Sequence, residues 1–237
     1  MAKDLAGLTI HHLRKQHASG FSLGPVDLKL PSGECLGLVG ANGSGKTTLL
    51  RCILATTSLD TGTVTWRDHE VKVGSPTPGV VGMLEEPRLF GRLSAVDNLV
   101  AALADGVNLV DCRQALARVG LGDVGSLPVA RFSQGMRQRL GLARLLVKPK
   151  ELIVLDEPSN GLDPVGIRWL RNLIGELRAS GATVIVSSHA LYEVQQVMTQ
   201  FLLLGDGKVL AQGSREELGE VVTLEDLYFR ALGEGSS

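Results

Sequence analysis

Hydrophobic residues recur with two different spacings along this chain of 237 residues. In the first third, short apolar stretches separated by Gly, Pro and Asp predict strands, namely 8–13, 26–30, 35–39, 62–66 and 80–84. Between residues 95 and 147 the apolar positions recur at helical spacing, which predicts a mostly helical block. After Pro149 the pattern alternates between strands at 152–155, 183–187 and 201–204 and helices at 165–179 and 190–198. Such alternation predicts a parallel sheet that helices cover on both faces.

Composition and charge exclude several classes of protein. A hydrophobic content of 44% can build a substantial core, and the length fits one domain. Because 24 Lys and Arg nearly balance 25 Asp and Glu, we expect no nucleic-acid partner. The apolar runs are far shorter than the roughly 20 residues of a spanning helix, and the start does not resemble a signal peptide, so a cytoplasmic location is expected. Cys35, Cys52 and Cys112 lack C-x-x-C spacing and are expected to be reduced.

Residues 40–47 match the phosphate-binding motif G-x-x-x-x-G-K-[ST], the P-loop, between an apolar strand and a predicted helix at 48–55. Its glycines let backbone N–H groups surround a β-phosphate at the start of the helix. Lys46 would contact the β and γ oxygens, and the Thr47 hydroxyl could bind Mg²⁺. The motif predicts a nucleoside triphosphate ligand, with a solvated Gly-rich turn as the alternative. The expected nucleotide-binding residues are Gly40, Ala41, Asn42, Gly43, Ser44, Gly45, Lys46, Thr47 and Thr48.

Two acidic residues, Asp156 and Glu157, follow the apolar strand at 152–155. In open α/β sheets, ligands bind at the carboxyl ends of the strands. Asp156 is placed to hold Mg²⁺ through water, and Glu157 to orient or deprotonate the attacking water. The pair therefore predicts hydrolysis, not phosphoryl transfer. Two acids at a strand end would by themselves indicate a solvated turn or a helix cap, and it is the P-loop upstream that favours the catalytic interpretation.

Three further segments complete a set of motifs. They are Arg-Phe-Ser-Gln-Gly-Met-Arg-Gln-Arg-Leu at 131–140, Glu-Pro-Ser-Asn-Gly-Leu-Asp-Pro at 157–164 and Ser-Ser-His at 187–189. With the P-loop, in this order and spacing, they resemble the ABC ATPase family over nearly the whole chain. The resemblance implies an α/β fold of the P-loop NTPase class, with a mixed sheet core, an N-terminal antiparallel β region and an inserted helical subdomain. It also implies a single ATPase domain over 1–237, with the helical subdomain at roughly 87–148.

The resemblance implies a head-to-tail dimer of two nucleotide-binding subunits, here expected to be two copies of this chain. Ser133, Gln134 and the backbone of Gly135 would contact the γ-phosphate held by the partner's P-loop. A serine hydroxyl and free N–H groups at a helix start do bind anions, although an ordinary serine N-cap is the alternative. His189 resembles the family's γ-phosphate-sensing histidine, a polar turn residue being the alternative, and Asp163 the residue that couples the two sites. The expected catalytic residues are Lys46, Glu157 and His189.

Two positions of the nucleotide site depart from the family's pattern. The family usually has a glutamine after the strand at 80–84, where Glu85 is the best match and would be a third Mg²⁺ ligand beside Thr47 and Asp156. Carboxylates about 4 Å apart repel by about 4 kcal/mol at an effective dielectric near 20, so Mg²⁺ must offset that repulsion. The family's base-stacking aromatic is also missing, and His17 or Phe21 could stack on adenine instead.

The third departure is Gln134, which stands where the family's first signature glycine would be and restricts close approach of the backbone. This signature, together with the segment 85–87 and the tail at 224–228, resembles bacterial ABC-2-type exporters of drugs, antimicrobial peptides or lipids. The resemblance implies ATP and Mg²⁺ as cofactors, integral membrane subunits as partners, and a location on the cytoplasmic face of the membrane through those subunits.

The motifs are also compatible in part with three alternatives to an active transporter subunit. A catalytically weak or regulatory ABC subunit stays open because of Gln134 and Glu85. A soluble ABC ATPase of DNA repair or translation would need a long coiled-coil insertion or two cassettes with a basic linker, and the sequence contains neither. A P-loop GTPase would need an Asn-Lys-x-Asp motif, which the sequence lacks.

Overall fold

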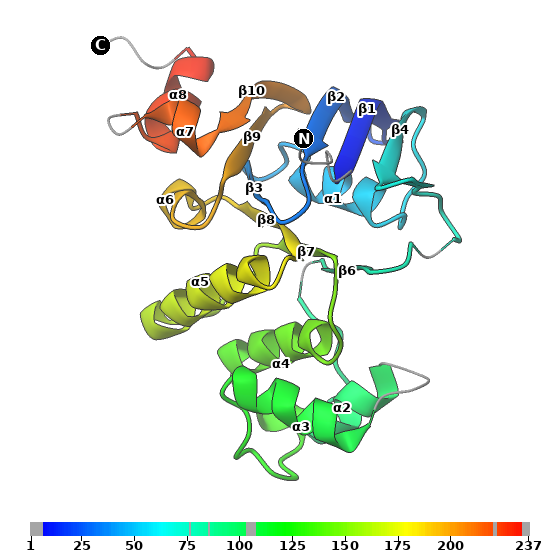
Figure 1. Ribbon diagram of the computed structural model, residues 1–237, viewed down its shortest axis with the longest axis vertical. Helices are drawn as coiled ribbons and strands as arrows, with labels where there is room; N and C mark the ends of the chain where they lie inside the picture. The colour runs from blue at the N-terminus through cyan, green and yellow to red at the C-terminus, as the bar shows by residue number, and fades with distance from the viewer. Residues whose placement is uncertain (1–6, 76, 85, 103–107, 220–221, 234–237) are drawn as a thin grey trace, which may run out of the picture.

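The strands form two sheets in the computed structural model, which describes residues 7–75, 77–84, 86–102, 108–219 and 222–233 (Figure 1). The first sheet is antiparallel, with the strand order β2-β1-β4-β5, and the second has the order β10-β9-β3-β8-β7-β6. The strands are β1 (Leu8–Gln16), β2 (Ser22–Leu30), β3 (Cys35–Val39), β4 (Thr61–Trp66), β5 (His69–Glu70), β6 (Val80–Met83), β7 (Leu152–Asp156), β8 (Thr183–Ser188), β9 (Gln200–Gly205) and β10 (Lys208–Ser214).

The second sheet brings three strand ends to one edge. Strands β3, β6, β7, β8 and β9 run parallel. Val39 at the end of β3 pairs with Ser188 of β8, and Asp156 at the end of β7 pairs with Ser187. The loops that follow β3, β7 and β8 therefore start side by side, which is where ligands bind in sheets of this kind.

The described part of the chain contains eight α-helices, several of which start at a side-chain N-cap. They are α1 (Lys46–Ile53), α2 (Ala95–Ala102), α3 (Leu109–Arg118), α4 (Gln134–Leu146), α5 (Pro164–Ala179), α6 (Leu191–Gln195), α7 (Arg215–Leu218) and α8 (Leu224–Ala231), with a short 3-10 helix at Val129–Arg131. For α5, Pro164 occupies the first turn and the Asp163 side chain accepts the Gly166 N–H at 2.8 Å. Both features stabilise a helix start.

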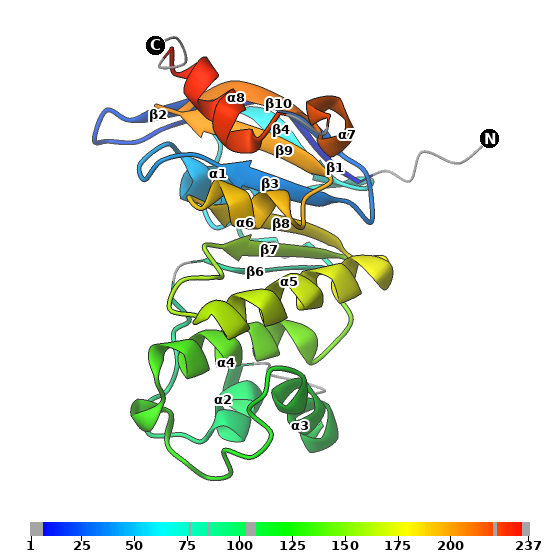
Figure 2. The same cartoon turned by 90° about the vertical axis from the view of Figure 1, so that its left-hand side faces the viewer.

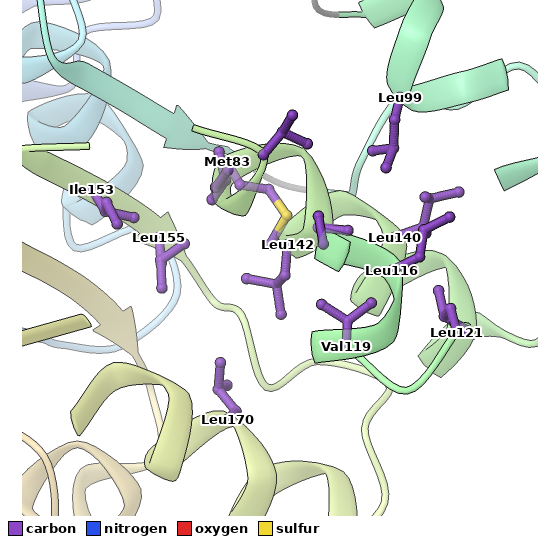
Figure 3. Close-up of a cluster of buried hydrophobic side chains, with 14 of the residues drawn as sticks. Met83, Leu99, Leu116, Val119, Leu121, Leu140, Leu142, Ile153, Leu155 and Leu170 are labelled. Atoms are coloured by element: carbon purple, nitrogen blue, oxygen red, sulfur yellow. The ribbon is translucent and has the colours of Figure 1, made fainter. Parts of the chain in front are cut away.

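The second sheet is buried on both faces, as the alternate side chains of β7 illustrate. Leu152 and Val154 pack with β1, β2, β4 and α1, whereas Ile153 and Leu155 pack with α2 to α5. Figure 3 shows this second cluster, with Ile153 and Leu155 on β7 and Leu142 and Leu170 on the helices. Helices α2, α3 and α4 lie at one end of the molecule (Figure 2). Since they share a core with β7, these helices are packed onto the sheet.

The expected fold class is confirmed, including its mixed sheet core. The alternating pattern alone predicts parallel strands, and the antiparallel member of the mixed sheet is β10, which pairs with β9. The two strands are joined by Asp206 and Gly207, whose φ angles are 47° and 75°. Positive φ at both turn residues is typical of the tight Asp-Gly turn of a β-hairpin. The helix expected at 190–198 is also shorter, since α6 ends at Gln195.

The three cysteines are free and buried in the core, as the sequence predicts. Burial raises the pKa of the Cys35 thiol to about 12 and that of Cys52 to about 11. Both side chains therefore stay protonated at neutral pH and act as small hydrophobic groups. None of the described helices has the length and apolar character that crossing a bilayer requires.

Gly37 in β3 allows α6 to pack directly onto the sheet. A Cβ at this position would lie 2.2 Å from Val194 Cγ1 and 3.3 Å from Met198 Cβ. We therefore expect Gly37→Ala to lower the free energy of unfolding by about 1–3 kcal/mol through overpacking, as measured by urea denaturation. In the matched control Gly175→Ala, on the exposed side of α5, the new Cβ meets no atom within 4 Å. It should raise stability by roughly 0.5–1 kcal/mol; equal effects of the two variants would contradict this account.

Candidate functional site

The P-loop, Gly40–Thr47, connects β3 to α1 and depends on its glycines. Gly43 and Gly45 have φ angles of 82° and 106°, a conformation that other residues rarely adopt. A Cβ on Gly40 would lie 2.2 Å from the Leu204 carbonyl oxygen and 2.5 Å from Ser44 Oγ. Helix α1 begins at Lys46, and the N–H groups of its first turn have no carbonyl partner within the helix. A helix start of this kind binds phosphate.

Lys46 is buried and connects the P-loop to the acidic pair. Its side chain is 6% exposed, and its Nζ donates to the carbonyl oxygens of Gly40 at 2.7 Å and Ala41 at 3.2 Å. The same ammonium lies 3.5 Å from Glu157 Oε1. Because a buried charge requires partners, these oxygens fix the position of the ammonium.

Asp156 lies at the centre of a hydrogen-bond network with Thr47 and Ser187. Thr47 Oγ1 donates to Asp156 Oδ2 at 2.7 Å, and Ser187 Oγ donates to Oδ1 at 2.5 Å. Ser187 also accepts the Glu157 N–H at 2.9 Å. Sequence reasoning did not assign a role to Ser187, because its contact with Asp156 depends on the pairing of β8 with β7.

The oxygens of Thr47 and Asp156 suit Mg²⁺, a hard cation that prefers oxygen ligands. Within the described part of the chain, no three His, Cys, Asp or Glu side chains converge on one point. Mg²⁺ that binds with a nucleotide needs only one or two protein oxygens, because phosphates and water complete its coordination. Glu85, the expected third ligand, lies outside the described residues.

Glu157 has an uncommon backbone conformation, and its carboxylate lies between Lys46 and His189. Its φ angle is 47°, and such strain in a non-glycine residue is typical of active sites. Oε2 lies 2.9 Å from His189 Nδ1, while Oε1 has no hydrogen-bond partner and faces Lys46 at 3.5 Å. Oε1 is buried and pairs with the Lys46 ammonium, so both carboxylate oxygens of Glu157 are held in place.

Lys46, Thr47 and Glu157 line a cavity of about 460 Å³, whereas Asp156, Ser187 and His189 do not line it. Its lining consists of His17, Ser19, Phe21, Asn42, Gly43, Gly45, Lys46, Thr47, Thr48 and Glu157. His17 Nε2 lies 3.2 Å from Thr48 Oγ1, so the ring is tied to the first turn of α1. Phe21 packs against the P-loop, because a Cβ on Gly45 would lie 3.2 Å from its Cζ. A larger hollow of about 780 Å³ beside α7 includes no P-loop residue.

The signature residues do not line this cavity. Ser133 is exposed at the N-cap of α4, where its Oγ accepts the Met136 N–H at 3.2 Å. Gln134 packs over Gly161, and its Nε2 lies 3.5 Å from Glu86 Oε1. Asp163 caps α5 in the same way. Within one chain, Ser133 and Asp163 therefore both act as helix N-caps. For Ser133 this is the alternative to the signature role.

Comparison with known proteins agrees with this geometry. The family model described as "ABC transporter" matches residues 23–160. "Lantibiotic transport ATP-binding protein SrtF" of Streptococcus pyogenes is 35% identical over 228 residues, which cover 93% of this chain and 95% of that protein. "Bacitracin transport ATP-binding protein BcrA" of Enterococcus faecalis is 32% identical over 212 residues, covering 87% of this chain and 69% of that protein.

Solved structures give the same fold. The structure of an "ATP binding subunit of ABC transporter" matches with a TM-score of 0.81 and 27% identity, over 95% of this chain and 99% of that one. A dimeric ATP-binding cassette in a post-hydrolysis state, bound to ADP and Pi, matches with a TM-score of 0.78 over 88% of this chain and 98% of that one. At 20% identity, the second match supports the fold alone.

Proposed function

Because this chain belongs to the ABC transporter family as an ATP-binding, ATP-hydrolysing subunit, we propose that it hydrolyses ATP at sites that two copies of the chain build together. The observation that carries this proposal is the position of Glu157. It sits at the end of β7, with Lys46 at 3.5 Å and His189 at 2.9 Å on its two carboxylate oxygens. The carboxylate is thereby directed to the cavity that the P-loop lines.

Each residue of the site has a task in this proposal. The P-loop N–H groups and Lys46 bind the β- and γ-phosphates. Thr47 and Asp156 would hold Mg²⁺, which supplies charge neutralisation at the phosphate oxygens. Glu157 accepts a proton from the attacking water, and His189 orients the carboxylate through its 2.9 Å contact. Ser187 hydrogen-bonds both the Asp156 carboxylate and the Glu157 N–H, and so fixes the position of the two acids relative to each other.

The second half of each site comes from the partner in this proposal. Ser133, Gln134 and the Gly135 backbone lie at the exposed start of α4 and do not line their own chain's cavity. A helix start with a serine and free N–H groups attracts an anion, so the partner's γ-phosphate is a suitable ligand. Asp163 is the N-cap of α5 and follows Gly161, which contacts Gln134; it is assigned to coupling between the two sites.

The transporter that this subunit drives is proposed to be an exporter. The support is that SrtF is named for lantibiotic transport and BcrA for bacitracin transport. Integral membrane subunits would be its partners and would hold it at the cytoplasmic face of the membrane. We assign residues 1–237 to one ATPase domain with a helical subdomain at roughly 87–148, and the core shared by β7 and helices α2 to α4 supports this.

The experiment that tests the proposal is Mg²⁺-dependent ATP hydrolysis by the purified chain as a function of protein concentration. A site built by two chains predicts a specific activity that rises with concentration until the dimer is saturated. A constant specific activity from dilute to concentrated protein would show that one chain suffices. No hydrolysis at any concentration would favour the regulatory alternative.

His17 is proposed to stack on the base of the nucleotide. His17→Ala should raise the Kd for ATP by about threefold to tenfold, because an aromatic stacking contact contributes about 0.5–1.5 kcal/mol. The loss should be similar for GTP, since stacking does not distinguish purines by hydrogen bonds. Both constants can be measured by isothermal titration calorimetry.

The matched control for this stacking prediction is His69→Ala. His69 is an exposed histidine on β5 that does not line the cavity. The control should leave both dissociation constants unchanged. Unchanged affinity in His17→Ala itself would remove His17 from the base site and leave Phe21, which packs against Gly45, as the candidate.

A further inference from the structure

One peptide unit of the P-loop is held from both sides by side chains. The Gly40 carbonyl oxygen accepts a hydrogen bond from Lys46 Nζ at 2.7 Å. The N–H of the same peptide unit, at Ala41, donates to the hydroxyl of Tyr228 at 3.2 Å. Tyr228 lies in α8 and is 187 residues from Ala41 along the chain. A residue of the last helix is thus a direct partner of the phosphate-binding loop.

Helix α8 is fixed in place by contacts of its own. Its first residue, Leu224, is buried and donates its N–H to Gln195 Oε1 of α6 at 3.1 Å. A capping box between Thr223 and Asp226 stabilises the helix start. Leu224 and Tyr228 belong to a hydrophobic cluster that includes Val39, the residue before the P-loop. Figure 2 shows α8 beside β10, on the part of the molecule that also holds α6.

The Tyr228 hydroxyl that binds the P-loop therefore belongs to a helix whose position is fixed by its own contacts. A peptide unit next to glycine can rotate easily, because glycine has access to a wide range of φ and ψ. Holding the Ala41 N–H sets the orientation of that unit, and this keeps the Gly40 carbonyl directed at Lys46. Without the hydroxyl, the carbonyl that positions the ammonium would be free to turn away.

We propose that Tyr228 is a positioning residue for nucleotide binding: its hydroxyl orients the Gly40–Ala41 peptide unit and, through it, Lys46. The inference rests on the proposed function of the P-loop as the ATP site. It also assigns a role to α8, which makes the nucleotide affinity of this subunit depend on the docking of its last helix.

Tyr228→Phe is the variant that tests this role, because it removes the hydroxyl and keeps the ring in its hydrophobic cluster. One net hydrogen bond corresponds to a change of about threefold to tenfold in an equilibrium constant. We expect the Kd and KM for ATP to rise by that factor while kcat changes by less than twofold. In the nucleotide-free protein, alanine-selective NMR should show faster amide exchange at Ala41.

The matched control is Tyr192→Phe, which changes the chain's other tyrosine, 71% exposed on α6. It should leave affinity and Ala41 exchange unchanged. Unchanged Ala41 exchange and Kd in Tyr228→Phe would overturn the inference. So would a rise in Kd that comes with a matching fall in melting temperature, because that result would show a general loss of fold. If the wild-type chain bound no ATP, the proposed function would fail, while Ala41 exchange would still decide whether the contact exists.

Discussion

Glu157→Gln is expected to lower the rate of ATP hydrolysis by about 100-fold or more, which is the lower range for loss of a general base. The amide has the size of the carboxylate but cannot take a proton from the attacking water. Lys46 and the P-loop are unchanged, so ATP binding should persist. Removal of a negative charge near the γ-phosphate should also favour the ATP-bound dimer. Single-turnover hydrolysis and light scattering with and without ATP measure the two effects.

Glu151→Gln is the matched control at the other end of β7. Glu151 immediately precedes β7, at the opposite end from Glu157, and forms a surface ion pair with Arg67 at 2.9 Å. An exposed pair of this kind contributes little to stability, so this variant should hydrolyse ATP at the wild-type rate. If Glu157→Gln retained more than a tenth of the activity, another group would be the base. Loss of activity in both variants would point to damage to β7.

Ser133→Asp should abolish ATP-driven dimerisation and lower hydrolysis by about 100-fold or more, without destabilising the chain. Asp is as good an N-cap as Ser, so the bond from the Met136 N–H is kept. In a dimer the new carboxylate would face the partner's γ-phosphate. Charges about 4 Å apart repel by about 4 kcal/mol at an effective dielectric of 20. Urea denaturation, light scattering and hydrolysis assays together measure the outcome.

Asn108→Asp is the matched control, because it adds the same negative charge at the N-cap of α3 in the same helical region. Dimerisation and hydrolysis should be unaffected in this variant. If Ser133→Asp remained active, Ser133 would be only the helix cap that it is in the single chain. The capping role and the proposed partner contact are thus separated by one substitution.

The parallel core of the fold could be predicted from the sequence because burial on both faces leaves continuous apolar runs. β3 was predicted at its observed bounds, 35–39, and β7 and β8 within one residue. β10 was missed because its side chains are half-buried and mixed in character. The Asp206-Gly207 pair was a hairpin signal in the sequence, and it would have predicted the antiparallel edge strand.

Site residues could be predicted where they belong to one short motif. Contacts between segments that are far apart in the sequence could not be predicted. Lys46 in the P-loop and the two acids at the end of β7 could be predicted, because each follows from the sequence around a single strand end. The contact of Ser187 with Asp156 depends on which strand lies beside β7. The Tyr228 contact depends on where α8 docks, and no periodicity in the sequence contains that information.

Mixing two inactive variants tests the shared site most directly. Lys46→Ala should be inactive because it removes the charge that holds the phosphates, and Ser133→Asp because it repels them from the partner. In a head-to-tail dimer of one copy of each, one site combines an intact P-loop with an intact signature. An equal mixture should recover up to about a quarter of wild-type hydrolysis, since half of the dimers are mixed and each has one intact site. A mixture as inactive as its components would contradict a site built by two chains.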